Sequence, residues 1–192
     1  MLFRSLHHPN LKWTKLQSKS MNIPQLIISS SSDDTHDELI VLEKLLKNAI
    51  DEFEIEGLVH GGIKSNFQKE KFEDLTAKLN LKIISPLWDS EPKQYMNDLL
   101  ESNFCFIMTT VSSDGLDEQW LGKLISKSDL KRLDELSDKF GFNLNFEGGE
   151  AETFVIDCPL FSNSIKINKS SKNWDGYRGR FEIVDAELNY NA

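Results

Sequence analysis

Short apolar runs alternate with amphipathic stretches along the first 111 residues, and this alternation limits the folds that the chain can adopt. Runs of strand length occur at 25–30, 57–63, 82–86 and 104–111. The stretches between them carry apolar residues at helical spacing, as in LIVLEKLLKNAI. Strands that alternate with helices are typical of a parallel sheet. We therefore predict an α/β part whose last strand, at 104–111, is buried on both faces of the sheet.

The periodicity changes after residue 114. A helix is expected at about 128–140, because three leucines recur there on one face. Only short strands follow, and the polar stretch 168–179 between the last two is interpreted as a hairpin loop. The sequence therefore predicts a second, antiparallel-rich subdomain from about residue 115.

Composition argues against several classes of function. The 192 residues include 31 acidic and 22 basic side chains, which give a net charge of −9. Phosphate backbones are bound by clustered Lys and Arg, so nucleic acid is not expected as a direct partner. No apolar run reaches the length of a membrane span, and the basic N-terminus lacks the apolar core of a signal peptide. We therefore expect a cytoplasmic protein without a membrane partner.

Cysteine usage points the same way. Cys105 and Cys158 both lie in apolar, strand-like runs and have no CxxC spacing. Buried, reduced thiols fit this placement better than a disulfide or a pair of metal ligands. We predict free thiols and assign no metal site.

Polar and aromatic residues follow each predicted strand, at the place where ligands bind in open α/β sheets. The candidates are 29–34; Gly61, Gly62, Lys64 and Ser65; Pro86 and Trp88; and 112–114. The loop HGGIKS is also compatible with a flexible turn, because two glycines without a following Gly-Lys-Ser/Thr are a weak phosphate-binding signal. On their position alone, Trp88 and Trp120 fit packing in the core or at its rim better than they fit a ligand site.

The stretch NLNFEGGEAETFVIDCPLF, at 143–161, crowds Glu147, Glu150 and Glu152 around a double glycine at the start of a predicted strand. Neighbouring carboxylates repel one another unless a positive group lies among them or solvent surrounds them. A solvated turn satisfies the second condition. The alternative is a ligand site, which the double glycine favours because it lets the backbone approach a ligand closely.

Four segments together resemble the diphthine-ammonia ligase family, a branch of the PP-loop ATP pyrophosphatases. They are HGGIKSNFQKEKFEDLTAKLNLKIISPLW, YMNDLLESNFCFIM, SSDGLDEQWLG and FEGGEAETFVIDCPLF, and their order and spacing match the family from about residue 7 to about residue 168. The resemblance implies a parallel-sheet, HUP-like (adenine nucleotide alpha hydrolase-like) ATP-binding part over 1–114. It also implies a smaller α+β substrate-binding subdomain over 115–192.

The N-terminal segment LHHPNLKWTKLQSKSMNIP resembles the family's His-x-Pro-Asn segment and the helix after it, with His7, Asn10, Gln17 and Pro24 at the matching positions. The family's SGG-x-D-S loop, which would precede this segment, does not occur in the sequence. A PP-loop holds pyrophosphate through backbone N–H groups at a helix N-terminus. We therefore expect an N-terminally truncated ATP-binding part whose affinity for ATP has collapsed.

The resemblance also implies a reaction and its partners. In the family, the carboxylate of diphthine, a modified histidine of translation elongation factor 2, is adenylated by ATP with release of pyrophosphate. Ammonia then captures the acyl-adenylate and gives diphthamide. The expected partners are ATP with Mg²⁺, ammonium, and elongation factor 2 carrying diphthine.

Site residues follow from the same resemblance as expectations. Three glutamates are expected to bind ammonium, and one of them to accept its proton: Glu147, Glu150 and Glu152. Residues expected to contact ATP are His7, Asn10, Gly61, Gly62, Ser65, Gln68 and Lys71. Residues expected to contact the substrate are Trp88, Trp120, Gly148, Gly149 and Thr153, with the two tryptophans facing the trimethylammonium group through cation–π contacts.

Two other functions remain compatible with the sequence. One is a PP-loop enzyme that activates a different substrate, because the ATP chemistry of a fold transfers more readily than its substrate. The other is a non-catalytic binding module that has lost the ATP loop.

Overall fold

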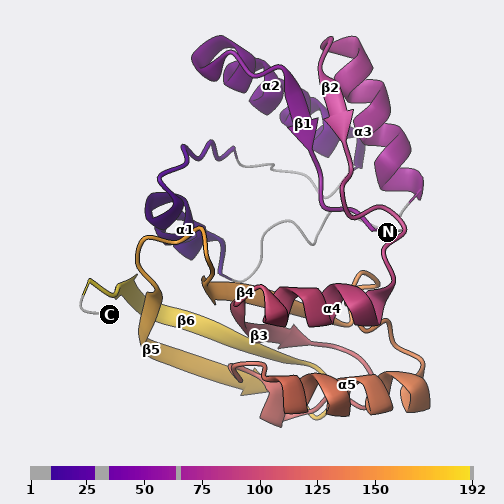
Figure 1. Cartoon of the computed structure of the whole chain (residues 1–192), viewed down its shortest axis with the longest axis vertical. Coiled ribbons are helices and arrows are strands. Elements are labelled where there is room, and N and C mark those ends of the chain that lie inside the picture. Colours follow the sequence, from indigo (N-terminus) through magenta and orange to yellow (C-terminus); the bar gives the residue numbers. More distant parts are fainter. Residues whose placement is uncertain (1–9, 29–34, 64–65, 191–192) are drawn as a thin grey trace. The chain divides into compact units, whose positions relative to one another are not determined.

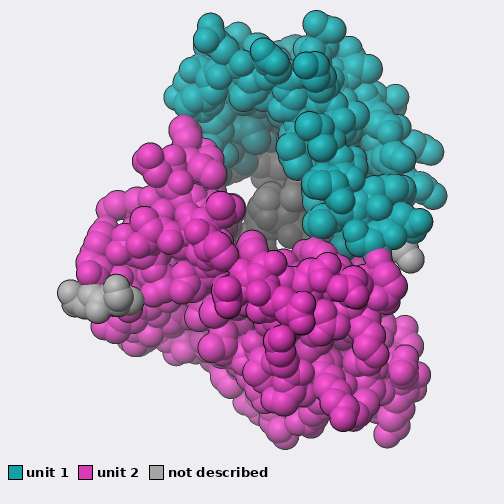
Figure 2. Space-filling view, in the orientation of Figure 1, with its two compact units in different colours: residues 1–6, 26–90 teal, residues 7–25, 91–192 magenta. Residues whose placement is uncertain are grey.

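The computed structural model describes residues 10–28, 35–63 and 66–190. The chain divides into two compact units, coloured teal and magenta in Figure 2. Unit 1 comprises Met1–Leu6 and Leu26–Ser90, and unit 2 comprises His7–Gln25 and Glu91–Ala192. Each unit contains its own sheet.

Unit 1 contains one parallel strand pair and its crossover helix. The helix α2 (Thr35–Phe53) precedes the strand β1 (Gly57–Val59), and α3 (Asn66–Lys78) connects β1 to β2 (Lys82–Ile84). The two strands pair in parallel, in a register that aligns their first residues (Figure 1). A parallel pair needs a crossover of this kind, which α3 supplies. The predicted strands at 57–63 and 82–86 are confirmed, although both are shorter than predicted.

The strand predicted at 25–30 is wrong over its described part. Residues 23–28 have no regular structure, and Ile23 and Ile27 are 53% and 43% exposed. An apolar run becomes a strand only where another strand supplies hydrogen-bond partners. Within the described residues, β1 and β2 pair only with each other.

Unit 2 contains an antiparallel sheet. Among the residues that the structure describes, its strands are β3 (Cys105–Val111), β4 (Ala151–Asp157), β5 (Ile165–Trp174) and β6 (Gly179–Leu188), in the order β4-β3-β6-β5 (Figure 1). All three pairings are antiparallel. The predicted antiparallel-rich part is confirmed, but the prediction that the strand at 104–111 continues the parallel sheet is wrong.

The burial of β3 explains why its sequence resembles that of a parallel strand. Phe106, Ile107 and Met108 are consecutive and each is at most 3% exposed, so both faces of the strand are buried as predicted. Burial on both faces fixes the apolar composition of a strand, but the direction of its neighbours depends on which segments pair with it. The partners of β3 come from later in the chain and run antiparallel to it.

Helices of unit 2 pack against this sheet and against each other. They are η2 (Leu11–Trp13), α1 (Thr14–Met21), α4 (Pro92–Glu101), η3 (Glu118–Trp120) and α5 (Lys127–Phe140). Figure 1 shows α4 and α5 side by side, and an ion pair between Lys93 and Asp134 joins them. The predicted helix at 128–140 is confirmed as α5, and its Leu130 and Leu133 are buried in the core.

The hairpin of β5 and β6 is longer than predicted. Residues 168–174, predicted as loop, belong to β5, and the connection contains only 175–178. Polar side chains pair across the two strands, including Lys166 with Glu187 at 3.3 Å. Such cross-strand pairs stabilise a solvated sheet surface without apolar residues, so polarity alone does not indicate a loop.

Two predictions from composition can be compared with the structure. Cys105 and Cys158 are both free, as predicted, and Cys158 is buried while Cys105 is partly buried. None of the helices within the described ranges combines the length and the apolar character that crossing a membrane requires.

Candidate functional site

The predicted glutamate cluster lies at one end of the antiparallel sheet. There the last residue of β3, Val111, pairs with Ala151 at the start of β4 and with Gly179 at the start of β6. The loop 143–150 leads into β4 and therefore reaches the same end of the sheet as the end of β3. The segment after β3 was also predicted to carry polar site residues, and the structure brings 112–114 and this loop together.

Hydrogen bonds and buried aromatic rings hold the loop 143–150 in place. The Ser112 N–H donates to the carbonyl of Glu150 at 2.8 Å, and the Ser112 hydroxyl donates to the carbonyl of Gly149 at 2.7 Å. Phe146 is 7% exposed and stacks on Phe142. Gly149 has a φ of +84°, a conformation that glycine adopts without steric cost. These contacts fix the backbone conformation of the loop 143–150.

The side chain of Glu150 turns back into this loop. Its Oε1 accepts a hydrogen bond from the Asn143 N–H at 3.0 Å. A Cβ atom on Gly148 would collide with the same oxygen, so the carboxylate occupies the space that the missing side chain leaves. The other oxygen, Oε2, is buried and has no hydrogen-bond partner within the described residues. Glu150 thus helps to hold the loop, and part of its carboxylate remains available for a further interaction.

Glu152 differs from Glu150 because it lies within β4, opposite Thr110 of β3. Burial raises the pKa of Glu152 to about 7, and the positive charge of Arg180 opposes this rise. A carboxyl group with this pKa exchanges a proton readily near neutral pH. Thr153, the next residue, is exposed and points to the opposite face of the strand, since successive side chains alternate.

Glu147 is partly buried and lies near α4. Burial raises the pKa of Tyr95 in α4, and the negative charge of Glu147 raises it further. The three glutamates therefore occupy three different environments, and Glu152 has the one that best suits proton transfer. Sequence reasoning treated them as equivalent because it could not distinguish the strand position from the loop positions.

Trp120 lies in the hydrophobic core. It is 1% exposed, and the side chains of Lys123 and Arg132 lie 5.4 Å and 5.3 Å from its ring centroid. Of the two possibilities that the sequence left open, packing in the core describes this residue. Its placement does not support contact with a substrate cation.

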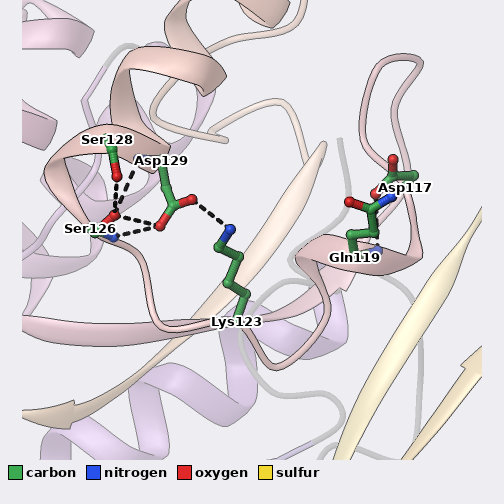
Figure 3. Close-up of polar contacts among 6 residues, drawn as sticks. All are labelled: Asp117, Gln119, Lys123, Ser126, Ser128 and Asp129. Atoms are coloured by element: carbon green, nitrogen blue, oxygen red, sulfur yellow. Dashed lines mark hydrogen bonds and ion pairs between the residues drawn. The ribbon is translucent and has the colours of Figure 1, made fainter.

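A polar network fixes the segment around Trp120 (Figure 3). Asp117 caps η3 by accepting a hydrogen bond from the Gln119 N–H at 2.9 Å. Ser126 and Asp129 form a capping box at the start of α5, and Lys123 binds Asp129 at 2.6 Å. Burial acts to raise the pKa of Asp129, but hydrogen bonds from Lys123 and Ser126 outweigh it and lower the pKa.

Asn10 is also structural. Its Nδ2 donates to the carbonyl of Phe181 at 3.1 Å, and its Oδ1 accepts from the N–H of Ile183 at 2.9 Å. Gln17, another position of the predicted family segment, donates to the carbonyl of Val155 at 2.8 Å. These side chains attach the N-terminal segment to β6 and β4, so the position of Asn10 does not support contact with ATP.

In unit 1, the loop after β1 is organised by His60, which sequence reasoning did not select. His60 is 7% exposed, and its ring stacks on Phe72 at 5.0 Å between centroids. The Gly62 N–H donates to Nδ1 at 3.2 Å, which leaves Nε2 to donate its proton to Ser85 at 2.5 Å. Among the described residues, no atom lies within 4 Å of a Cβ added at Gly61, so this part of the structure leaves the loop open there.

The remaining candidates in unit 1 are only partly described. Trp88 is half-buried, and the amino group of Lys69 lies 4.4 Å from its ring centroid. Lys71 and Gln68 lie on α3, but the structure does not describe the Gln68 side chain. His7, Lys64, Ser65 and 29–34 lie outside the described residues. The roles predicted for these residues remain predictions.

The fold and the site define an α/β protein with a parallel βαβ unit and a glutamate-bearing loop at the end of an antiparallel sheet. A family model for the diphthamide synthase N-terminal domain matches residues 3–83, and one for the diphthamide synthase C-terminal domain matches residues 91–188. The chain belongs to the diphthamide synthase family, which confirms the predicted resemblance.

Individual relatives agree with this assignment. The chain is 32% identical over 156 residues to a diphthine–ammonia ligase of Homo sapiens, a match that covers 81% of this chain and 57% of that protein. It is 33% identical over 156 residues to the Bos taurus protein of the same name, with the same coverage. The match to the Rattus norvegicus protein is 37% identical over 135 residues and covers 70% and 50% of the two chains. The chain thus spans about half the length of these relatives.

Proposed function

We propose that this chain takes part in diphthamide biosynthesis as an ATP-dependent diphthine–ammonia ligase. The observation that carries the proposal is Glu152, a half-buried carboxyl group with a pKa of about 7 beside the double-glycine loop. The names of the relatives and both family matches support the same reaction class. Elongation factor 2 carrying diphthine is the proposed protein substrate.

The proposed reaction has two steps. A carboxylate oxygen of diphthine forms a bond to the α-phosphorus of ATP, and pyrophosphate leaves. The nitrogen of ammonia then forms a bond to the acyl carbon of the acyl-adenylate, and AMP leaves with the oxygen of the broken bond. Ammonia must be neutral to attack, so a group on the protein has to accept a proton from ammonium.

Glu152 is suited to this proton transfer. In its charged form it attracts ammonium, and its raised pKa allows it to take a proton and later release it near neutral pH. Glu150 contributes differently, because one of its oxygens is bound to the loop backbone and the other is buried and unpaired. We assign Glu150 to the shape of the site and to holding ammonium, and Glu152 to the proton.

The described part of unit 1 contains features that fit a nucleotide. The loop after β1 lies at the carboxyl end of a parallel strand, no described atom crowds a Cβ at Gly61, and α3 follows the loop. Lys71 on α3 is proposed to neutralise phosphate oxygens, as the sequence predicts. ATP, with Mg²⁺, would supply the activation of the carboxylate. This assignment and a cytoplasmic location remain proposals.

The test measures the two steps separately: pyrophosphate release reports the activation of the carboxylate, and ¹⁵N incorporation reports the formation of the amide. Wild type, Glu152→Gln and Glu182→Gln proteins are given ATP, ¹⁵N-ammonium and a protein or peptide carrying diphthine. Glu182 is the matched control, because it is an exposed glutamate on β6. We expect Glu152→Gln to keep pyrophosphate release and to lose ¹⁵N incorporation by about 10²-fold, while the control keeps both.

Three other outcomes would contradict parts of the proposal. Unchanged ¹⁵N incorporation in Glu152→Gln at limiting ammonium would remove Glu152 from the mechanism. Pyrophosphate release with other carboxylates but not with diphthine would favour a different PP-loop enzyme. The third outcome is binding of the diphthine peptide without any pyrophosphate release. If a chain extended to an upstream in-frame start, where one exists, behaves in the same way, the result would favour the binding module.

A further inference from the structure

A row of polar residues crosses the antiparallel sheet at its site end. Glu152 of β4 pairs with Thr110 of β3, Thr110 pairs with Arg180 of β6, and Arg180 pairs with Asn173 of β5. Residues that are directly opposite each other in a sheet point to the same face. The four side chains, which we call the polar row, therefore share one face of the sheet.

Within the polar row, a carboxyl group and a guanidinium group lie on either side of a small residue. Neighbouring strands are about 4.8 Å apart, so the backbones of Glu152 and Arg180 are separated by about 10 Å, with Thr110 between them. Glu152 is half-buried and Arg180 is exposed. Within the described residues, neither forms an ion pair with the other or with any other group, although the charge of Arg180 acts on Glu152.

Thr110 separates a carboxyl group from a guanidinium group on one face of the sheet. A guanidinium group binds a carboxylate through two parallel hydrogen bonds, which fixes the orientation of the carboxylate. A triphosphate would carry several negative charges toward Glu152, whereas a single carboxylate places one charge next to Arg180. The chemistry of the row therefore fits a monocarboxylate with a cation or a neutral amine on its Glu152 side.

We infer that Arg180 binds the carboxylate of the substrate above Thr110, across from Glu152. Arg180 would thereby orient the acyl carbon toward the ammonia that Glu152 holds, so that the two reacting groups lie on either side of β3. This inference rests on the proposed function. It adds a substrate-binding residue on β6, which the sequence alone did not single out.

The experiment compares two ligands and two matched variants. One ligand is a peptide carrying diphthine, and the other is the same peptide carrying diphthamide, in which an amide replaces the carboxylate. The variants are Arg180→Gln and Arg178→Gln, which remove the same charge from exposed positions two residues apart, and Arg178 lies outside the polar row. Binding is measured by calorimetry without ATP, and cooperative urea unfolding checks that each variant folds.

The expected result is a selective loss of carboxylate recognition. Wild type should bind the diphthine peptide more tightly than the diphthamide peptide. Arg180→Gln should weaken diphthine binding by about 10- to 100-fold, the range for a hydrogen-bonded charge pair, and leave diphthamide binding unchanged. Arg178→Gln should change neither affinity.

Three results would overturn the inference: equal affinities of wild type for both peptides, no binding of either peptide, or the same effect of both arginine variants. The outcome is separable from that of the proposed function. Normal ¹⁵N incorporation in Arg180→Gln would leave the ligase intact and reject the role of Arg180. Arg180-dependent binding of the diphthine peptide in a chain that never forms an amide would keep the carboxylate site and reject the ligase.

Discussion

Glu152 allows a test of the site that needs no substrate. Its carboxyl group is partly buried, and its titration therefore makes the stability of the folded protein depend on pH. Burial raises the pKa of Glu152 to about 7, against an ordinary value of 4.5. Replacement by Gln keeps the size of the side chain and removes the titration. We expect Glu152→Gln to be more stable than wild type above about pH 7 and to lose this advantage at acidic pH.

The sign follows from proton binding. The folded protein holds the Glu152 proton more tightly than the unfolded chain, so this contribution to stability is present below about pH 4.5 and is lost as pH rises through about 7. The step from 4.5 to about 7 corresponds to at most about 3 kcal/mol. Glu152 is partly exposed to solvent, which screens the effect, and we therefore expect about 1 to 2 kcal/mol.

The assay is urea unfolding of wild type, Glu152→Gln and the exposed control Glu182→Gln at intervals from about pH 4 to about pH 9. The free energy of unfolding of Glu152→Gln minus that of wild type should grow as pH rises from about 5 to about 8. A difference that is independent of pH, or that is equally large in the control, would refute the assignment of a raised pKa to Glu152.

Three further predictions concern residues that shape the site. Asn10→Ala should lower the free energy of unfolding by about 2 to 4 kcal/mol in urea titrations, because two buried backbone groups of β6 lose their partner. Trp120→Ala should cost about 3 to 5 kcal/mol in the same assay, since this ring is 1% exposed in the core. Gly148→Ala should displace the Glu150 carboxylate from the Asn143 N–H and cost about 1 to 2 kcal/mol, a loss that Glu150→Ala should largely reproduce.

Much of the fold follows from periodicity in the sequence. The strands β1 and β2, the crossover helix α3 and the helix α5 lie where apolar spacing predicts them. Their patterns are local, because each depends on residues within one element. The fold class, with a parallel pair and an antiparallel sheet, is therefore confirmed.

Strand direction and strand ends were less predictable. The strand β3 has the apolar composition of a parallel strand, but its neighbours in the sheet are 40 or more residues later in the chain. The strand β5 extends through polar residues whose partners lie on β6. Both properties depend on distant pairing, which the local sequence does not encode. The functional division expected at residue 114 remains a prediction.

Some features of the candidate site could be recognised in the local sequence, and others depend on the fold. The glutamate cluster and its double glycine were recognisable because charge crowding next to glycines is unusual in a short stretch. The distinction between Glu150 and Glu152 depends on which carboxylate turns into the loop and which lies on a strand. Arg180 carries no local signal, since an isolated arginine in a polar hairpin resembles a solubilising residue.

The end of the antiparallel sheet can assemble a site for the same geometric reason that the ends of parallel strands can. In a parallel sheet, the carboxyl ends of successive strands meet at one edge and their loops converge there. In this sheet, the carboxyl end of β3 meets the amino ends of β4 and β6, so the loop 143–150 and the turn 175–178 extend past the same edge. Val111 contacts both neighbours there, and Glu152 and Arg180 follow one residue further along β4 and β6. A carboxyl group and a guanidinium group that are distant in sequence are thereby placed two strands apart on rigid backbone, which is the condition for orienting two reacting groups.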